Sequence, residues 1–571
     1  MNFKNEKIVE IKICQKCQLS FDVTDKDLEF YHTVSPTFAW KKYAIPSPTL
    51  CPDCRQQRRL SWYNESQLYK TQCHYTKKPI ISMHRPGVPY IVYDIKEWMW
   101  DSFDGFDTGK DFDFDRPFFE QWDELLKSTP IPNRDVFELT NSEYTNYAGY
   151  LKDCYLIFQS DENENCCYGK FYFRSKNSYD CFGLYDSDNC YECVDCINSF
   201  GLFFSENTKD SSNSYFLKNC VSCNDCYGCV NMNNAQYCIF NKQYSKEEYK
   251  QYIENRPHKN MWDLKIYKQE FQDFSAKNIM KNLNNIWCEN TLWERNFHSK
   301  NIINGYDNIE VEEWKYISVV RWGKQVMDIN CFGGNLNQSY EWLVVWMNSS
   351  NICYSYSCWG NVSHIFYSYF CIVWCKDCFG CVWLKGQQYC ILNKQYSKQE
   401  YEELVPKIIE HMRSTWEWWE FFPSSLSPFG YNETVATEYF PLDPAQSENQ
   451  WFNWSDYASP TPNVVKTIPA DKLPDSIDDI PDDILNWAII CEITGKTFTI
   501  IAWELAFYRK YQLPIPRRHP DQRHLDRMNL RNPRKLFERD CDKCWIGMQT
   551  TYAPERPEKV YCEECYNKEI Y

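Results

Sequence analysis

Two stretches in the middle of the chain, residues 141–250 and 295–402, are copies of each other. In the best-matched part, from Val221 to Tyr249, most positions are identical at an offset of 152. A duplicated segment keeps the residue pattern that made the original fold. We therefore expect both copies to adopt the same structure, which restricts the architecture of the whole middle of the chain.

Within each copy, short apolar runs rich in aromatic residues recur, such as Cys154–Phe158 and Ser214–Leu217. Asn, Asp, Ser and Gly separate the runs at intervals of roughly 9–14 residues, which is typical of strands joined by turns. Such repetition favours a solenoid, whose turns stack and bury a shared interior. We predict a mainly β protein with two tandem β-solenoids of the right-handed parallel β-helix type. An antiparallel β-sandwich is the alternative.

Each copy ends in a helix-start signal, Ser245-Lys-Glu-Glu in the first and Ser397-Lys-Gln-Glu in the second. In a capping box of this kind, the serine bonds the third helical amide and the glutamate reaches back. A helix should therefore follow each copy. The second helix, from Lys398 to about Arg413, is expected to cover the open end of its solenoid, where strand edges would otherwise be unpaired.

Paired cysteines lie at both ends of the chain in Cys-x-x-Cys turns. Such a turn places two thiolates on one side of a knuckle, and two knuckles supply the tetrahedron that Zn²⁺ prefers, with Zn–S distances of about 2.3 Å. All-cysteine sites are structural, because catalytic zinc keeps an open position. We predict two zinc ions per chain, held by Cys14, Cys17, Cys51 and Cys54 and by Cys541, Cys544, Cys562 and Cys565.

Aligning the two ends shows that each carries two consecutive ribbon-like sites, one of which has lost most of its ligands. Cys14 aligns with Cys491 at an offset of 477, and Cys73 aligns with Cys541 at an offset of 468. We expect the altered sites to be metal-free, because Thr and Gln are poor zinc ligands, with Cys491 and His519 left open. These sites comprise Cys73, Thr76, Asp94 and Glu97, and Cys491, Thr494, His519 and Gln522.

The central copies carry further cysteines at every third position, as in the run Cys220, Cys223, Cys226 and Cys229. This spacing resembles an iron–sulfur ligand run. The alternative is that cysteine fills a narrow interior as a small apolar residue. At an offset of 150, the triplet Cys190, Cys193 and Cys196 corresponds to Tyr340, Leu343 and Trp346, which favours packing. The triplet Cys223, Cys226 and Cys229 is present in both copies, and metal binding there stays open.

Composition bears on location and partners. The 31 cysteines are an odd number, no signal-peptide pattern precedes them, and no apolar run reaches membrane-spanning length. We expect a cytoplasmic protein with reduced thiols, no membrane association and no nucleotide cofactor, since no Gly-rich phosphate loop is present. The net charge of −16 argues against a chain that coats nucleic acid over its whole surface.

Positive charge gathers next to the cysteine knuckles. Residues 509–535 hold nine Lys and Arg against two Asp, and residues 51–78 hold six against two acidic residues. Basic side chains beside a zinc ribbon often touch phosphates, which makes RNA a candidate partner. The alternative is a solvated basic face, or one paired with the acidic linker of the same chain, residues 423–484. The candidate contacts are Arg55, Arg58, Arg59, Arg523, Arg527 and Arg531.

These observations divide the chain into seven segments. The predicted segments are a duplicated zinc-ribbon module with its first site intact (1–100), an acidic and aromatic connector with a helix (101–140), the first solenoid (141–250), a helical connector (251–294), the second solenoid with its capping helix (295–422), a Pro- and Asp-rich linker (423–484), and a zinc-ribbon module with its second site intact (485–571).

The chain also resembles a family of zinc-ribbon proteins from uncultured small-genome bacteria. The resemblance rests on Cys51–Arg59, Cys226-Tyr-Gly-Cys229, Asn241–Tyr244 and Thr550–Pro557 among other stretches, and it extends over nearly the whole chain. It implies zinc binding and a cytoplasmic location but no activity. Some members carry a CoA-transferase (CaiB/BaiF) label; that chemistry uses an aspartate nucleophile on an α/β fold, whose alternating pattern is not seen here.

No convincing catalytic centre emerges from these patterns. The function we favour is a non-enzymatic, zinc-binding scaffold that binds a protein or RNA partner. A carbohydrate-binding or carbohydrate-active β-helix is the first alternative, with the acidic residues Asp161, Glu162 and Glu164 as its candidate cluster. An iron–sulfur redox protein built on Cys223, Cys226 and Cys229 is the second.

Overall fold

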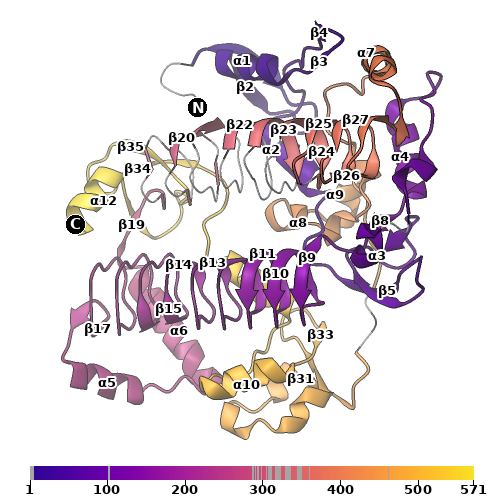
Figure 1. Ribbon diagram of the computed structural model, residues 1–571. Coiled ribbons are helices and arrows are strands. Elements are labelled where there is room, and N and C mark those ends of the chain that lie inside the picture. Colours follow the sequence, from indigo (N-terminus) through magenta and orange to yellow (C-terminus); the bar gives the residue numbers. More distant parts are fainter. Residues whose placement is uncertain are drawn as a thin grey trace. The chain divides into compact units, whose positions relative to one another are not determined.

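The computed structural model divides the chain into two compact units, each formed from two separate stretches. One unit joins residues 1–134 to 283–457, and the other joins 135–282 to 458–571. Each unit therefore combines one terminal module with one solenoid copy. Figure 1 colours the chain by residue number, so the two stretches of each unit can be found in it.

The described residues are 6–570 without 101–102, 286–287, 290, 292–294, 297–298, 304, 307–311, 316–322, 328–335, 344–349, 359, 459 and 461, so Trp346 lies outside them.

The first copy of the repeat is a parallel β-solenoid, which confirms the predicted fold class. Its strands hydrogen-bond in chain order, and every partner lies at a sequence separation of 12, from Thr145 with Ile157 to Tyr227 with Ile239. Figure 1 shows its strands as a ladder. The strands are β9 (Val136–Thr140), β10 (Thr145–Lys152), β11 (Tyr155–Glu164), β12 (Cys167–Phe173), β13 (Phe182–Tyr185), β14 (Val194–Ile197), β15 (Phe200–Phe203) and β16 (Ser212–Tyr215), followed by the hairpin of β17 (Cys238–Ile239) and β18 (Lys242–Gln243).

A period of three explains the length of this turn. From Arg174 to Asn231, every third residue has a positive φ, and most of these residues are Asn, Asp or Gly, which adopt this conformation most readily. Each such residue bends the chain, so four bends complete one turn. The residue that follows each bend is buried throughout Ser175–Cys229 and points into the solenoid.

The inward residues are small and hydrogen-bonded from turn to turn. Ser205 donates its hydroxyl to the carbonyl of Phe203 (3.0 Å) and accepts the amide of Leu217 from the next turn (3.1 Å). Cysteine plays the same part, because the Cys181 sulfur accepts the amide of Cys193 (3.2 Å). Inward amides thus find partners in side chains of the preceding turn, which explains why Ser and Cys recur in the interior.

The second copy is built the same way with slightly longer turns. Ser350 pairs with Ser363 and Ser363 with Lys376, each at a sequence separation of 13, whereas Lys376 pairs with Gln388 at a separation of 12 as in the first copy. Its described strands are β20 (Lys300–Ile303), β21 (Glu312–Lys315), β22 (Gly323–Met327), β23 (Leu336–Leu343), β24 (Ser350–Tyr356), β25 (Ser363–Phe366), β26 (Tyr369–Ile372), β27 (Lys376–Phe379), β28 (Val382–Lys385), β29 (Gln388–Ile391) and β30 (Lys394–Gln395).

Both predicted capping boxes are confirmed. Ser245 begins helix α5 (Lys246–Glu254) and Ser397 begins helix α7 (Lys398–Ser414), and in each case the serine and the glutamate three residues on bond each other's amides. Helix α7 packs on β29, the last parallel strand of the second solenoid, where Tyr401 lies 5.8 Å from Tyr389 between ring centres. The end of this solenoid is therefore covered as predicted.

The terminal modules show one pattern four times, as a duplicated pair of sites at each end requires. Each repeat has a β-hairpin that carries the first knuckle and a helix that begins at the second. The hairpins are β1 (Ile8–Ile13) with β2 (Ser20–Thr24), β5 (Tyr69–Gln72) with β6 (Pro79–Ser82), β32 (Trp487–Ile490) with β33 (Thr497–Phe498), and β34 (Phe537–Asp540) with β35 (Gly547–Thr550). The helices are α2 (Pro52–Leu60), α3 (Ile95–Met99), α11 (Pro520–Met528) and α12 (Glu563–Ile570).

The remaining elements connect and cover these parts. In the acidic linker, Ile477, Ile480 and Ile484 are buried in the core shared by the first solenoid and the C-terminal module, so this part of the linker packs against both. No helix in the described part of the chain is long and apolar enough to cross a membrane. The other elements are α1 (Asp25–Val34), β3 (Thr37–Phe38), β4 (Lys41–Lys42), β7 (Val92–Tyr93), α4 (Phe118–Ser128), β8 (Ile131–Pro132), α6 (Met261–Ser275), β19 (Ile279–Lys281), α8 (Ala436–Tyr439), α9 (Pro444–Asn449), β31 (Lys466–Pro469), α10 (Ala502–Lys510) and β36 (Lys559–Tyr561).

Candidate metal centres

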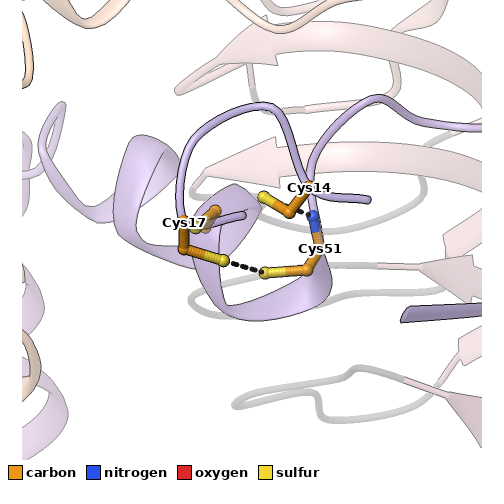
Figure 2. Close-up of side chains that lie close together, drawn as sticks. Cys14, Cys17 and Cys51 are labelled. Atoms are coloured by element: carbon orange, nitrogen blue, oxygen red, sulfur yellow. Dashed lines mark hydrogen bonds between the residues drawn. The ribbon is translucent and has the colours of Figure 1, made fainter. Parts of the chain in front are cut away.

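Two groups of four cysteines bring their sulfur atoms together, and they are the two groups predicted from the sequence. Within each group all four sulfurs lie within 4.8 Å of one another. Figure 2 shows three members of the N-terminal quartet, with the Cys17 and Cys51 sulfurs 3.7 Å apart. A tetrahedron with Zn–S bonds of ~2.3 Å has sulfur–sulfur edges of about 3.8 Å. The cysteines are free thiols, since a disulfide would need about 2.05 Å.

In the N-terminal quartet, backbone hydrogen bonds shape the first knuckle. The amide of Cys14 donates to the carbonyl of Leu19 (2.9 Å), and the amide of Gln18 donates back to the carbonyl of Cys14 (3.0 Å). Gln18 closes the turn with a φ of 62°. The second knuckle approaches through the amide of Cys51, which donates to the Cys14 sulfur (3.3 Å; Figure 2), and α2 starts directly after Cys51.

The C-terminal quartet has the same local geometry. The amide of Cys541 donates to the carbonyl of Ile546 (3.0 Å), and the amide of Trp545 donates back to the carbonyl of Cys541 (2.9 Å). These bonds are equivalent to those of Cys14 with Leu19 and Gln18. Trp545 closes the turn with a φ of 61°. The amide of Cys562 donates to the Cys541 sulfur (3.2 Å), and the sulfurs of Cys544 and Cys562 lie 3.8 Å apart. Two sites at opposite ends of the sequence thus use one construction, in which N–H donors stabilise a thiolate that also faces the metal position.

The two altered sites keep the knuckle but lack the quartet. Cys73 accepts the amide of Asp94 (3.3 Å), and Cys491 accepts the amide of Thr494 (3.4 Å), so each lone sulfur is still held by backbone donors. The Nδ1 atom of His519 accepts the amide of Asp521 (3.1 Å) and thereby caps α11. Among the described residues, the two quartets are the only groups of three or more metal-ligating side chains with this spacing.

The thiols of a quartet cannot all ionise without a cation. A hydrogen bond from Cys54 lowers the pKa of the Cys51 thiol to about 5, and the same contact raises the pKa of Cys54 well above its usual range. Burial acts to raise the pKa of Cys541, but the backbone donors of Cys544, Cys562 and Lys543 outweigh it and lower this pKa to about 6. One thiolate per quartet forms readily, and the others need a bound dication.

The arginines predicted to contact nucleic acid are buried against the protein's own groups. In the C-terminal module, Arg523 and Arg527 both bind the carboxylate of Asp180 on the first solenoid, and Arg527 does so at 2.9 Å. Arg531 binds Asp195 of the same solenoid at 3.0 Å. These arginines therefore meet carboxylates of the same chain and dock the module onto the solenoid. The alternative interpretation expected such pairing within the chain, but with the acidic linker, whereas these partners lie on the solenoid.

The N-terminal arginines are placed in the same way. Arg55, Arg58 and Arg59 on α2 are all buried. Arg55 donates to the carbonyl of Leu50 (3.0 Å), and Arg58 pairs with Glu420 at 2.5 Å. A phosphate backbone would have to displace these partners, so the placement of all six arginines argues against the predicted RNA contact. Sequence spacing located the basic clusters but could not show that carboxylates hundreds of residues away neutralise them.

The central cysteines lie in the solenoid interior and donate to backbone carbonyls. Cys223 donates to the carbonyl of Met232 (3.3 Å) and Cys226 to that of Asn224 (3.3 Å). Cys229 donates to the carbonyl of Tyr227 (3.5 Å), and Cys220 makes equivalent bonds. The backbone of the solenoid wall thus contacts each of these sulfurs, which favours the packing interpretation. The period of three that places these cysteines inside was visible in the sequence as repeated Asn/Asp-Cys/Ser-x triplets.

The acidic cluster of the carbohydrate alternative lies on the outside of the first solenoid. Glu164 is paired with Lys152 at 2.6 Å and with Lys176 at 3.3 Å, one turn to either side. These contacts hold the pKa of Glu164 below its usual range, chiefly through the hydrogen bond from Lys152. A general acid needs a raised pKa instead. Glu164 is therefore a structural residue that links neighbouring turns through ion pairs with Lys152 and Lys176.

Fold and site together define a class of protein: a β-solenoid protein with terminal modules that carry four-cysteine metal centres. No protein-family model, no curated protein and no solved structure matches the chain.

Proposed function

We propose that the protein is a non-enzymatic scaffold in which each terminal module holds one structural zinc ion. The observation that carries this proposal is the convergence of four thiols at each end with the edge length of a tetrathiolate site. Protein ligands would fill all four positions around the ion, so no position remains for a water or substrate. Zinc suits this donor set because it is a common divalent ion that favours tetrahedral thiolate ligands, although iron binds such sites too.

The metal would join parts of the chain that burial alone holds weakly. At the N-terminal centre it would connect the β1–β2 hairpin to α2, which carries the docking arginines. At the C-terminal centre it would fix Cys562, directly after β36, which pairs with β19 at the end of the first solenoid. Metal binding then supplies folding free energy, of order ~10 kcal/mol, to small segments that cannot form a large core.

The scaffold role rests on the long solenoid surfaces, and the partner stays a prediction. A protein or an RNA remains the candidate, but RNA binding would have to use residues other than the six buried arginines. The resemblance to zinc-ribbon proteins of small-genome bacteria stays a prediction, and it would imply zinc as well. Tetrathiolate sites need reduced thiols, so a cytoplasmic location stays part of the proposal.

Elemental analysis of the purified chain tests the metal. We expect two zinc ions per chain and no iron. Cys541→Ser should lower the zinc content to one, because a three-cysteine site with a hydroxyl binds much more weakly. The matched control is Cys491→Ser, which alters a knuckle of the same geometry in a site without a quartet and should leave the zinc content at two. Iron in place of zinc, or equal losses in both variants, would contradict the proposal.

A further inference from the structure

Strand β1 presents an open edge that is unusually apolar. Within the described residues it hydrogen-bonds to β2 alone, in a two-stranded sheet. The side chains of Ile11 and Ile13 are 65% and 57% exposed, and those of Ile8 and Val9 are about as exposed. Edge strands of this kind are normally shortened, charged or covered, because their free amides and carbonyls pair with other strands. Among the described residues of this unit, no further strand pairs with the β1 edge, and Glu10 and Lys12 are its only charged residues.

The equivalent strand in the C-terminal module is covered by the chain itself. The alignment that matches Cys14 with Cys491 also matches Ile11 with Ala488 and Ile13 with Ile490. Strand β32 is paired along its other edge with β31 in parallel, from Lys466 with Trp487 to Pro469 with Ile490. Ala488 and Ile489 are fully buried as a result. Of these two aligned strands, β32 pairs with a second strand, β31, along its other edge, whereas β1 has no such second partner among the described residues.

The backbone of β1 presents its outward groups at defined residues. The amide of Cys14 points to β2, where it bonds the carbonyl of Leu19. Directions alternate along an antiparallel strand, so Lys12 and Glu10 also bond toward β2, whereas Ile13 and Ile11 point their amides and carbonyls away from it. Ile11 therefore offers one free donor and one free acceptor at the middle of the strand.

The sequence of β1 is complementary to itself about Ile11. In an antiparallel pair of two copies with Ile11 on the two-fold axis, Glu10 of each copy lies opposite Lys12 of the other, and Val9 lies opposite Ile13. Opposite charges and aliphatic pairs in these positions stabilise a sheet. Ser47 already holds the two charged side chains in place, since it bonds Lys12 Nζ at 3.0 Å and Glu10 at 3.1 Å.

We propose that β1 is the contact by which two copies of this chain associate, through antiparallel pairing of their β1 strands into one four-stranded sheet. The contact is isologous, so it closes as a two-fold dimer and leaves no free edge at β1. It buries a short strand from each copy, which makes the dimer concentration-dependent. The proposal is independent of the metal, because the β1 edge lies outside both quartets.

Charge reversal tests both the contact and its register. Sedimentation equilibrium of the full chain over a range of concentrations should show a reversible monomer–dimer equilibrium. E10K and K12E should each weaken dimerisation about tenfold or more, because each variant sets like charges opposite each other twice per dimer. The double variant E10K/K12E restores both opposite-charge pairs and should recover the dimer. Metal content, measured on the same samples, reports whether each variant is folded.

The controls separate this contact from general stickiness. Ile493→Lys changes an equally exposed isoleucine in the C-terminal module and should leave dimerisation unchanged, whereas Ile11→Lys should abolish it. Wild-type protein that stays monomeric at all concentrations overturns the proposal. So does a dimer that E10K and K12E leave intact, or one that the double variant fails to restore while the metal content is normal.

Discussion

At the scale of single residues, Asp180 shows how one side chain joins two parts of the chain. It lies at a bend of the first solenoid with a φ of 54°, and it binds both Arg523 and Arg527. Arg523 also contacts Glu504 (3.3 Å), whose pKa burial raises even though Arg523 opposes the shift. A buried group of two cations and two carboxylates costs desolvation energy, but the loss of one partner costs more.

Replacement of Asp180 should therefore be far more damaging than that of a matched exposed residue. Asp180→Asn keeps a residue that tolerates the left-handed bend but leaves the buried Arg527 without its carboxylate and Arg523 with Glu504 alone, which should cost about 3–5 kcal/mol. Asp186→Asn changes a bend residue with a φ of 50° whose pair with Arg174 is exposed, and it should cost about 0–1 kcal/mol. Urea unfolding of the intact chain measures both; equal losses would argue against this account of docking.

At the scale of single elements, each turn of the solenoid depends on hydrogen bonds from its inward side chains. Ser205→Val removes the acceptor for the Leu217 amide and the donor to Phe203, and it should cost about 1–3 kcal/mol because both buried backbone groups lose a partner. Ser205→Cys should cost much less, since Cys181 bonds the Cys193 amide in the same way. Thermal unfolding compares the two variants. If valine were tolerated as well as cysteine, the hydrogen bonds of Ser205 between successive turns would not contribute to stability as proposed.

The connection between α5 and α6 contains a histidine that should make the first solenoid sensitive to acid. Burial lowers the pKa of His258 to about 4, and its ring stacks on Tyr215 at 4.6 Å between centres. The unfolded chain binds the proton near pH 6.5, so this contribution to stability is complete above pH 6.5 and is lost as the pH falls toward 4. The loss amounts to about 3 kcal/mol.

A phenylalanine in place of His258 cannot take up the proton. His258→Phe should therefore flatten the decline of unfolding free energy between pH 6.5 and 4, relative to wild type. The metal centres respond to acid in both proteins alike, so the difference between the two curves isolates the histidine. Urea titrations at several pH values provide the measurement, and parallel curves would assign the acid sensitivity to other groups.

At the scale of the whole molecule, the chain combines two kinds of stability that should separate when the metal is removed. The solenoids are held by hydrogen bonds between successive turns, which involve no metal. After chelation, hydrogen exchange should stay slow at inward amides such as that of Cys226, which bonds Ser214 at 3.0 Å. The amides of Cys51 and Cys562, which bond metal-site sulfurs, should exchange faster. Uniform loss of protection would show that the solenoids depend on the metal.

The local parts of this structure were predictable because their causes lie within a few residues. A Cys-x-x-Cys turn brings two sulfurs together, and a capping box starts a helix, whatever surrounds them, so both quartets and the starts of α5 and α7 were placed correctly. The solenoid followed from the repetition of short runs. The period of three is plain in the sequence only where cysteines recur, because the bends at Asn177 or Asp186 look like ordinary turn residues when each is read alone.

The amino-acid sequence by itself determined the two four-cysteine groups, the duplication and the β-solenoid, since each depends on spacing along the chain. The tertiary structure alone decided what the basic residues do and which parts belong together. Arg523 meets Asp180 only because the C-terminal module folds onto the first solenoid copy, and Arg58 meets Glu420 only because the N-terminal module joins the second. Charges on distant segments meet through the packing of the whole unit, a global property that no local pattern encodes.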